Sequence, residues 1–316
     1  MKTRNSIRFT LNVFGILLTF SFLNLTARAQ AFVSAKTGFD AGACPVTAPC
    51  RSITYSLTQA GEGGTVNVID SGNYEPFVVN KSLTVQAAPG IVAVITRNTA
   101  GPGISIEAQG IEHITIRGLT LNLPDNLFST GPGTVSPGFS VTGGGTVVIE
   151  RCIIRGFTIG VDAKMTGLLF IRDTQASGGT TGISLSANYL SLKVVLDRCQ
   201  ALRTGSTGLI VATSPSAIIR LTVRESQFSG TTFGVKVVPD ATGTADVNFD
   251  NCTIANNKFG IDVEGAGATA RISNSTITDN GAGLMTASGA TLLSRGNNTV
   301  EGNSINGNFT GTFLAK

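Results

Sequence analysis

Histidine and cysteine, two residue types common in catalytic and metal sites, are scarce in this sequence. Among 316 residues there is one histidine, His113, and there are five cysteines. His113 follows Glu112 at the start of a segment of alternating apolar residues, and no partner for proton transfer is near it in sequence. A general base needs such a partner to orient its imidazole. We therefore expect a solvated histidine, with a general base as the alternative.

The N-terminal segment predicts export. Three basic residues within the first eight positions precede the apolar run Phe9–Leu25, and the small-x-small site Ala27-Arg28-Ala29 follows it. This order is typical of a secretory signal peptide, here residues 1–29; a retained membrane anchor is the alternative. We predict a secreted protein (extracellular, cell surface or periplasm) with no membrane span after signal cleavage, because no later segment is apolar and long enough.

The charge balance separates the mature chain from nucleic-acid binders. The full chain has 23 basic and 19 acidic residues, and four of the basic residues but none of the acidic ones fall within residues 1–29. The remainder is balanced and lacks the basic excess that binding to a nucleic acid requires. We therefore expect no nucleic-acid partner.

Two of the cysteines lie close together in a loop that contains prolines. Cys44 and Cys50 belong to the segment F-D-A-G-A-C-P-V-T-A-P-C (39–50). Because exported proteins fold in oxidising compartments, this spacing predicts a small disulfide. A pair of free thiols is the alternative.

One pattern returns seven times between Thr146 and Asn308. It consists of an alternating apolar strand, a polar bend, a second short strand and then Gly-Φ-x-Φ, where Φ is apolar. The residue after the bend is, in order, Cys152, Thr174, Cys199, Ser226, Cys252, Ser275 and Asn298. The glycine returns with it at Gly160, Gly182, Gly208, Gly234, Gly260, Gly283 and Gly307. Such a period predicts stacked structural units with loops of variable length.

The alternation within each unit predicts strands with one inward face. Val147 and Ile149 are an example, and the inward set of one unit is too small to bury a core unless it stacks on its neighbours. Residues 249–263 (F-D-N-C-T-I-A-N-N-K-F-G-I-D-V) and 272–284 (I-S-N-S-T-I-T-D-N-G-A-G-L) resemble the generic repeat of the right-handed parallel β-helix, the pectate-lyase-like superfamily, of a bacterial exported type. The resemblance covers about Thr65 to the C-terminus. It implies an all-β fold, a single-stranded right-handed parallel β-helix of about nine coils with a short N-terminal cap helix.

The segments outside the regular repeats divide the mature chain. We expect residues 30–64 to form an N-terminal strand, the disulfide loop and the cap helix, and residues 65–316 to form the β-helix domain. Ile53 and Leu57 are four apart, with Ser52 as N-cap and Gly61 as stop, which predicts a short helix over the open end of the first coil. Residues 122–138 depart from the period and contain three prolines. This excursion is the favoured place for a site on general grounds, and a tolerated insertion is the alternative.

The polar bends carry charges whose order supports stacking. The first bend position is occupied by Glu150, Arg172, Asp197, Arg224 and Asp250, and the second by Arg151, Asp173, Arg198, Glu225 and Asn251. Equivalent residues in parallel stacked strands lie about 4.8 Å apart, where opposite charges attract. Alternating signs are therefore expected of a structural ladder. A charged groove for a polymer, the functional alternative, would favour one sign. By the same stacking, Cys152, Cys199 and Cys252 lie two coils apart, beyond disulfide or metal-cluster reach, and are predicted to be small apolar fillers.

The resemblance also allows a search for known catalytic patterns. Polygalacturonase-like enzymes require clustered aspartates with a Gly-His-Gly segment, whereas His113 lies in E-H-I. Residues 71–77 resemble the first-coil loop of pectinesterases without the catalytic carboxylate segment. Calcium-dependent pectate lyases use carboxylates and a basic residue on one outer sheet. The corresponding outward residues here are Asp162, Ser184, Ile210, Lys236, Asp262 and Met285. Because Asp162 and Asp262 would be about 19 Å apart, they cannot share an ion. The catalytic residues stay unassigned, and no metal or cofactor site is expected.

Two classes of function remain open. We favour a non-catalytic exported β-helix, a surface, matrix or polysaccharide-binding protein whose rigid side wall presents a ligand. The alternative is a polysaccharide lyase or glycoside hydrolase of the same superfamily. An enzyme would need two carboxylates, or a carboxylate with Arg, Lys or His, converging within about 10 Å in a cleft. The expected partner is a polysaccharide or cell-surface glycan. The chain has no tryptophan to stack on a sugar.

Overall fold

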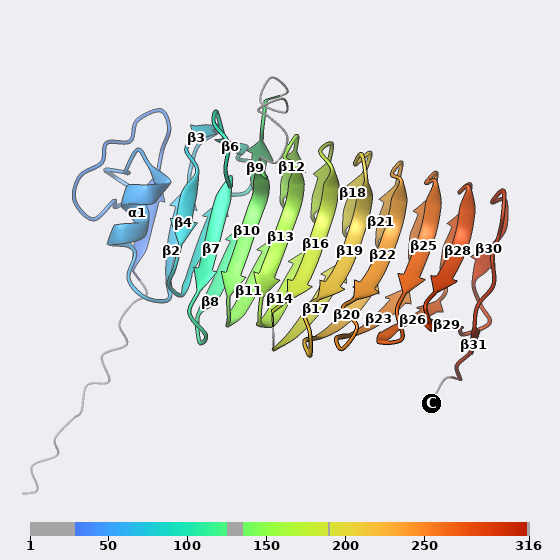
Figure 1. Ribbon diagram of the computed structural model, residues 1–316. Coiled ribbons are helices and arrows are strands. Elements are labelled where there is room, and N and C mark those ends of the chain that lie inside the picture. The colour runs from blue at the N-terminus through green and yellow to red at the C-terminus, as the bar shows by residue number, and fades with distance from the viewer. Residues whose placement is uncertain (1–28, 125–134, 189, 315–316) are drawn as a thin grey trace, which may run out of the picture.

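The computed structural model describes residues 29–124, 135–188 and 190–314 and shows a stack of parallel β-coils (Figure 1). The predicted signal peptide, apart from Ala29, and most of the 122–138 excursion lie outside the described residues. Each coil contributes one strand to each of three sheets, which we name A, B and C. Strands from successive coils pair in parallel throughout.

Sheet A forms one long side wall. Its strands, in order, are β1 (Gln30–Val33), β2 (Gly64–Val68), β5 (Leu83–Ala87), β8 (His113–Arg117), β11 (Thr146–Glu150), β14 (Gly167–Arg172), β17 (Ser191–Asp197), β20 (Ile218–Arg224), β23 (Thr244–Asp250), β26 (Ala268–Ser273), β29 (Thr291–Ser294) and β31 (Gly311–Thr312).

Sheets B and C complete the coils. Sheet B contains the short strands β3 (Gly72–Tyr74), β6 (Ala93–Thr96), β9 (Leu119–Asn122), β12 (Ile153–Arg155), β15 (Gln175–Ser177), β18 (Gln200–Leu202), β21 (Gln227–Ser229), β24 (Thr253–Ala255), β27 (Thr276–Thr278) and β30 (Thr299–Val300). Sheet C contains β4 (Phe77–Val79), β7 (Ile104–Ala108), β10 (Pro137–Gly143), β13 (Ile159–Met165), β16 (Thr181–Ala187), β19 (Thr207–Thr213), β22 (Phe233–Pro239), β25 (Phe259–Glu264) and β28 (Ala282–Ala287). The predicted all-β parallel coil stack is confirmed, and the predicted number of coils is approximately right.

The alternation seen in the sequence sorts side chains between the core and the surface. Val147 and Ile149 of β11 are fully buried and lie beside Leu169 and Ile171 of β14. The same inward positions along the stack form one continuous apolar core. Because each coil shares its buried face with the next, the long row of small units behaves as one domain.

The bend between sheets A and B has the same backbone conformation in successive coils. Its second residue has φ between +47° and +52°, the left-handed region, at Arg151, Asp173, Arg198, Glu225 and Asn251. A non-glycine residue rarely adopts this conformation, and Asn and Asp tolerate it best. The sharp corner that results turns the chain from sheet A directly into sheet B.

The residue after the bend is buried, as the repeat predicts. Cys152, Cys199 and Cys252 are free, buried cysteines. The residues between them are hydroxyl-bearing: Ser226 Oγ accepts a hydrogen bond from the Cys199 backbone N–H at 3.1 Å. Burial raises the pKa of the Cys152 and Cys199 thiols to about 12. The cysteines therefore serve as unreactive fillers in the described stack.

The N-terminal end of the stack is covered as expected. The helix α1 (Ile53–Gln59) begins after Ser52, whose Oγ accepts a hydrogen bond from the Tyr55 N–H at 3.1 Å. The helix ends just before Gly61, the expected stop: its C-cap is Ala60 in an extended conformation, and Gly61 does not adopt the left-handed φ of many capping glycines. The structure contains a disulfide between Cys44 and Cys50.

A hydrogen-bonded carboxylate joins this end to the first coil. Asp70 accepts hydrogen bonds from the Ser34 hydroxyl at 2.6 Å and from the Tyr74 hydroxyl at 2.5 Å. Although burial alone would raise the pKa of Asp70, these bonds and two from backbone N–H groups lower it to about 2. The loop after β1 is thereby held on the stack. In the part of the chain that the structure describes, no helix is long and apolar enough to cross a bilayer.

Candidate functional site

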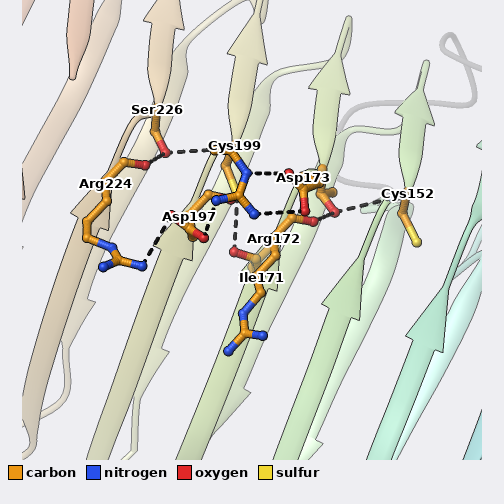
Figure 2. Close-up of polar contacts among 10 residues, drawn as sticks. Cys152, Ile171, Arg172, Asp173, Asp197, Cys199, Arg224 and Ser226 are labelled. Atoms are coloured by element: carbon orange, nitrogen blue, oxygen red, sulfur yellow. Dashed lines mark hydrogen bonds and ion pairs between the residues drawn. The ribbon is translucent and has the colours of Figure 1, made fainter. Parts of the chain in front are cut away.

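The charged bends form the predicted ladder. Glu150, Arg172, Asp197, Arg224 and Asp250 are successive partners in the register of sheet A. Arg198 joins two coils, because its guanidinium lies 2.6 Å from Asp173 Oδ1 and 2.8 Å from Asp197 Oδ2. Figure 2 shows these two aspartates on adjacent coils. Arg224 reaches the other Asp197 oxygen at 3.4 Å. The acids and bases of this row neutralise one another, which supports the structural interpretation.

Arg172 is an exception within the ladder. It stands between Glu150 and Asp197 in the register. Within the described residues, however, it forms no ion pair with either. Its guanidinium instead lies 5.2 Å from the ring centroid of Phe170 on its own strand, and in Figure 2 it points away from Asp173. The sequence pattern gave the correct neighbours but not the direction of this side chain.

The outward residues of sheet C stack in the predicted order. Asp162, Ser184, Ile210, Lys236, Asp262 and Met285 are consecutive partners. The register brings Lys236 and Asp262 together and leaves Asp162 several coils away, paired with Lys164 at 2.9 Å. The two aspartates thus do not share a site.

Lys236 and Asp262 belong to a larger group on two adjacent strands. We define the β22–β25 cluster as Phe233, Lys236, Lys258, Phe259, Asp262 and Glu264. Lys236 Nζ lies 3.0 Å from Asp262 Oδ2 and 2.7 Å from Glu264 Oε1. The same ammonium lies 4.7 Å from the ring centroid of Phe233. One cation therefore contacts two carboxylates and an aromatic face.

The phenylalanines of the cluster form a platform that sequence reasoning missed. Phe233 and Phe259 are register partners, half-buried, with ring centroids 4.9 Å apart and an interplanar angle of 26°. Lys258 Nζ lies 5.2 Å from the Phe259 centroid. The signal was present in the sequence, because both residues directly precede a repeat glycine, Gly234 or Gly260. Such a flat, half-exposed aromatic surface suits contact with the apolar face of a ring.

The electrostatics of the cluster hold its three charged groups together. Burial raises the pKa of Asp262, which is 3 % exposed, and the nearby Lys236 opposes that rise. The hydrogen bond from Lys236 lowers the pKa of Glu264. For Lys236, burial alone would lower the pKa, but the hydrogen bonds to Glu264 and Asp262 outweigh it and raise the pKa. At neutral pH the lysine is thus a held cation rather than a free base.

A pocket lined by charged side chains lies beside the start of the 122–138 excursion. Glu75, Arg51 and Arg97 line a pocket of about 390 Å³ together with Tyr74, Thr96 and neighbouring residues. The backbone N–H of Arg97 donates to the Asn122 carbonyl, where the excursion begins. This pocket brings a carboxylate and two guanidinium-bearing side chains into one concave space. Residues 125–134 of the excursion lie outside the described residues.

The remaining sequence candidates have no visible role in chemistry. His113 is exposed at the start of β8. Across the described ranges, no group of three or more His, Cys, Asp or Glu residues is placed to hold a metal ion.

Comparison with known proteins places the fold. The family description "right handed beta helix region" matches residues 221–316. No curated protein matches the chain by sequence. The structure is similar to that of pectate lyase Pel9A, with 13 % identity, a TM-score of 0.60 and coverage of 90 % of this chain and 77 % of the other. A rhamnogalacturonan lyase follows with 12 % identity, a TM-score of 0.56 and coverage of 89 % and 88 %.

A third similar structure is that of XylC in complex with xylose. Its identity is 10 %, its TM-score is 0.51, and the coverage is 82 % of this chain and 69 % of the other. At such identities the likeness concerns the fold alone. The chain folds as a right-handed parallel β-helix.

Proposed function

We propose that this protein is an exported, non-catalytic polysaccharide-binding β-helix, and that the outer wall of sheet C holds the sugar chain. The observation that carries the proposal is the half-exposed Phe233–Phe259 pair on adjacent coils. Stacking of sugar rings on such a platform supplies affinity without any reacting group. Because the two rings lie on adjacent coils, a polymer that runs along the stack could contact both.

The charges around the platform favour binding over catalysis. Lys236 is fixed between Asp262 and Glu264, so its proton and its charge are engaged inside the protein. A catalytic base would need a free lone pair near the substrate. Lys236 and Lys258 also lie against the two rings, where they keep the aromatic pair oriented.

The comparisons agree with a sugar partner. The similar structures include two lyases named for pectate and rhamnogalacturonan, and a protein that holds xylose. Export from the cell, which the N-terminal segment predicts, would bring this chain to such polymers. The Cys44–Cys50 disulfide is compatible with that location.

The test is retention on a panel of neutral and acidic polysaccharides, with an assay for new reducing or unsaturated ends. The wild-type protein should be retained by at least one polymer and should release no new ends. Phe233→Ala combined with Phe259→Ala should weaken retention about thirtyfold, since each of the two rings contributes on the order of 1 kcal/mol. Thr181→Ala, in the same outward row of sheet C, is the matched control and should bind as the wild type does. Unchanged retention of the double variant would remove the proposal.

A polysaccharide lyase or glycoside hydrolase is the second candidate, and one observation favours it. The pocket lined by Glu75, Arg51 and Arg97 brings a carboxylate and two arginine cations together next to the excursion. If new ends appear in the same assay, Glu75→Gln should abolish them while the Phe233→Ala/Phe259→Ala variant still cleaves. Cleavage that survives Glu75→Gln would exclude this pocket as its source.

A further inference from the structure

The outer face of sheet A carries a groove that the proposal for sheet C does not use. It has a volume of about 290 Å³ and crosses strands β14, β17, β20 and β23. We define the sheet A groove by Leu168, Phe170, Lys193, Val195, Arg220 and Thr222, all among its lining residues. Phe170, Val195 and Thr222 are consecutive partners in the register and form its floor.

Two cations lie side by side on this groove. Lys193 of β17 and Arg220 of β20 are direct register partners, and both are exposed. Neighbouring strands are about 4.8 Å apart, at which like charges repel. Neither residue forms an ion pair with any residue that the structure describes. Asp246, the next partner of Arg220, is engaged by Arg271 of the following strand. Asp246 also lines the groove, but its ion pair is with Arg271, so Lys193 and Arg220 give the groove an excess of positive charge.

A third cation leans toward the same floor. Arg172 lies over the ring of Phe170, which lines the groove, and not against the ladder acids beside it. Two cations and a guanidinium-covered ring thus surround a partly apolar surface. In this fold the bend charges are otherwise matched coil by coil. A bound anion would neutralise this local excess of positive charge.

We infer that the sheet A groove binds an acidic polysaccharide, with its carboxylates on Lys193 and Arg220 and its sugar rings over Phe170 and Val195. The guanidinium of Arg220 offers a fork of N–H donors that matches a carboxylate. The apolar floor suits the C–H faces of sugar rings and distinguishes this ligand from a free anion. The balanced charge of the mature chain disfavours a nucleic acid, which needs an extended basic surface. This site is separate from the β22–β25 cluster and does not depend on it.

The experiment measures the binding of polygalacturonate to the mature protein by isothermal titration calorimetry. Fully methyl-esterified polygalacturonate keeps the sugar and removes the charge, and dextran sulfate supplies charge on a different group. We expect binding of polygalacturonate that weakens with salt, and affinity for the methyl ester lower by about tenfold or more, because a hydrogen bond to a charged group contributes on the order of a factor of ten. Dextran sulfate that binds more tightly than polygalacturonate would overturn the assignment to carboxylates.

Variants locate the site. Lys193→Gln combined with Arg220→Gln should reduce the affinity for polygalacturonate by about a hundredfold, one factor of ten for each cation. Arg155→Gln combined with Arg203→Gln removes the same charge from exposed positions at the end of β12 and just after β18, and should leave the affinity unchanged. Retained binding by the first variant, or an equal loss in the control, would overturn the proposal.

Titrations in a second variant background separate the test of the sheet A groove from the test of the sheet C platform. All titrations are repeated with Phe233→Ala and Phe259→Ala present, so that a failure of the sheet C proposal leaves the groove measurable. The thermal unfolding midpoint of each variant shows that it is folded. A folded Lys193→Gln/Arg220→Gln protein that still binds in this background would contradict the groove assignment alone.

Discussion

Two rows of residues run along the same outer face of sheet A, four residues apart, and the second row breaks at one step the alternation of charge that the first row keeps. In the ladder row, each of the consecutive partners from Glu150 to Asp250 has a charge opposite to that of its neighbour. In the other row, Lys193 directly faces Arg220. The strands, the spacing and the solvent are the same, so the difference lies in the side chains alone.

This contrast separates a structural role from a binding role. A stack of coils is stabilised when equivalent positions attract, and the ladder does this with ion pairs such as that between Arg198 and Asp173. Two like charges on adjacent coils oppose stacking, although by a small amount at an exposed position. Because the Lys193–Arg220 pair costs stability and neither residue forms an ion pair with the residues described, we assign the pair to ligand binding.

The largest expected effect comes from breaking the ladder. Asp197→Arg would remove the carboxylate that contacts Arg198 and Arg224 and place three like charges together. The Asp197 side chain is only 8 % exposed, so we expect a loss of about 3 kcal/mol in the free energy of unfolding, as for other buried pairs that lose one partner. Urea denaturation followed by circular dichroism measures it. A loss below about 0.5 kcal/mol would mean that the ladder is an incidental surface feature.

The next largest effect distinguishes the two roles of arginine in the ladder row, ligand binding by Arg172 and an ion pair by Arg224. Arg172→Gln should lower the affinity for polygalacturonate about fivefold, because the cation over Phe170 is lost, and should barely change the unfolding midpoint. Arg224→Gln, two coils along, is the matched control: it loses the contact with Asp197 and should destabilise the protein without changing affinity. The reverse pattern would place Arg172 in the ladder and remove it from the groove.

A smaller effect is expected from pH. The hydrogen bond from Arg198 lowers the pKa of Asp173, and the pKa of an unfolded aspartate is about 3.9. The stability that Asp173 contributes is therefore fully present above that value and is lost as the pH falls below it. Asp173→Asn should unfold at lower urea than the wild type at pH 6, and the difference should shrink toward pH 2.5.

Asp279→Asn serves as the control for that measurement, because Asp279 is exposed at a turn and forms no ion pair with the residues described. It should show a small difference that does not follow pH in this way. A difference between Asp173→Asn and the wild type that stays constant from pH 6 to pH 2.5 would contradict the ion pair with Arg198.

Much of the fold was predictable because aligning the repeats gives the register of the stacked strands. Once Cys152, Thr174 and Cys199 are aligned, every other row follows, including the order from Asp162 to Met285. The same alignment contains the stacked Phe233–Phe259 pair and the Lys193–Arg220 pair, although neither was recognised as a candidate site. The direction of Arg172 could not be predicted, because it depends on a choice between two acids and a ring that are all within reach.

The sheet A groove and the pocket lined by Glu75 also could not be predicted from the sequence. A concave surface depends on the relative sizes of side chains on several strands, and a period of apolar residues carries no information on it. The end of the helix before Gly61 was predictable from the glycine, although neither Ala60 nor Gly61 adopts the left-handed conformation.

One variant tests the contrast between the two rows most directly. Lys193→Glu gives Arg220 an opposite partner, as in the ladder, and reverses the charge that the ligand would meet. The measurement is the thermal unfolding midpoint of this variant and of the wild type, each with and without polygalacturonate. Without polymer the variant should be slightly more stable, by about 0.5 kcal/mol; with polymer only the wild-type midpoint should rise, since a ligand stabilises the state that binds it. A variant that is less stable than the wild type without polymer, or that gains as much from polygalacturonate, would contradict the account.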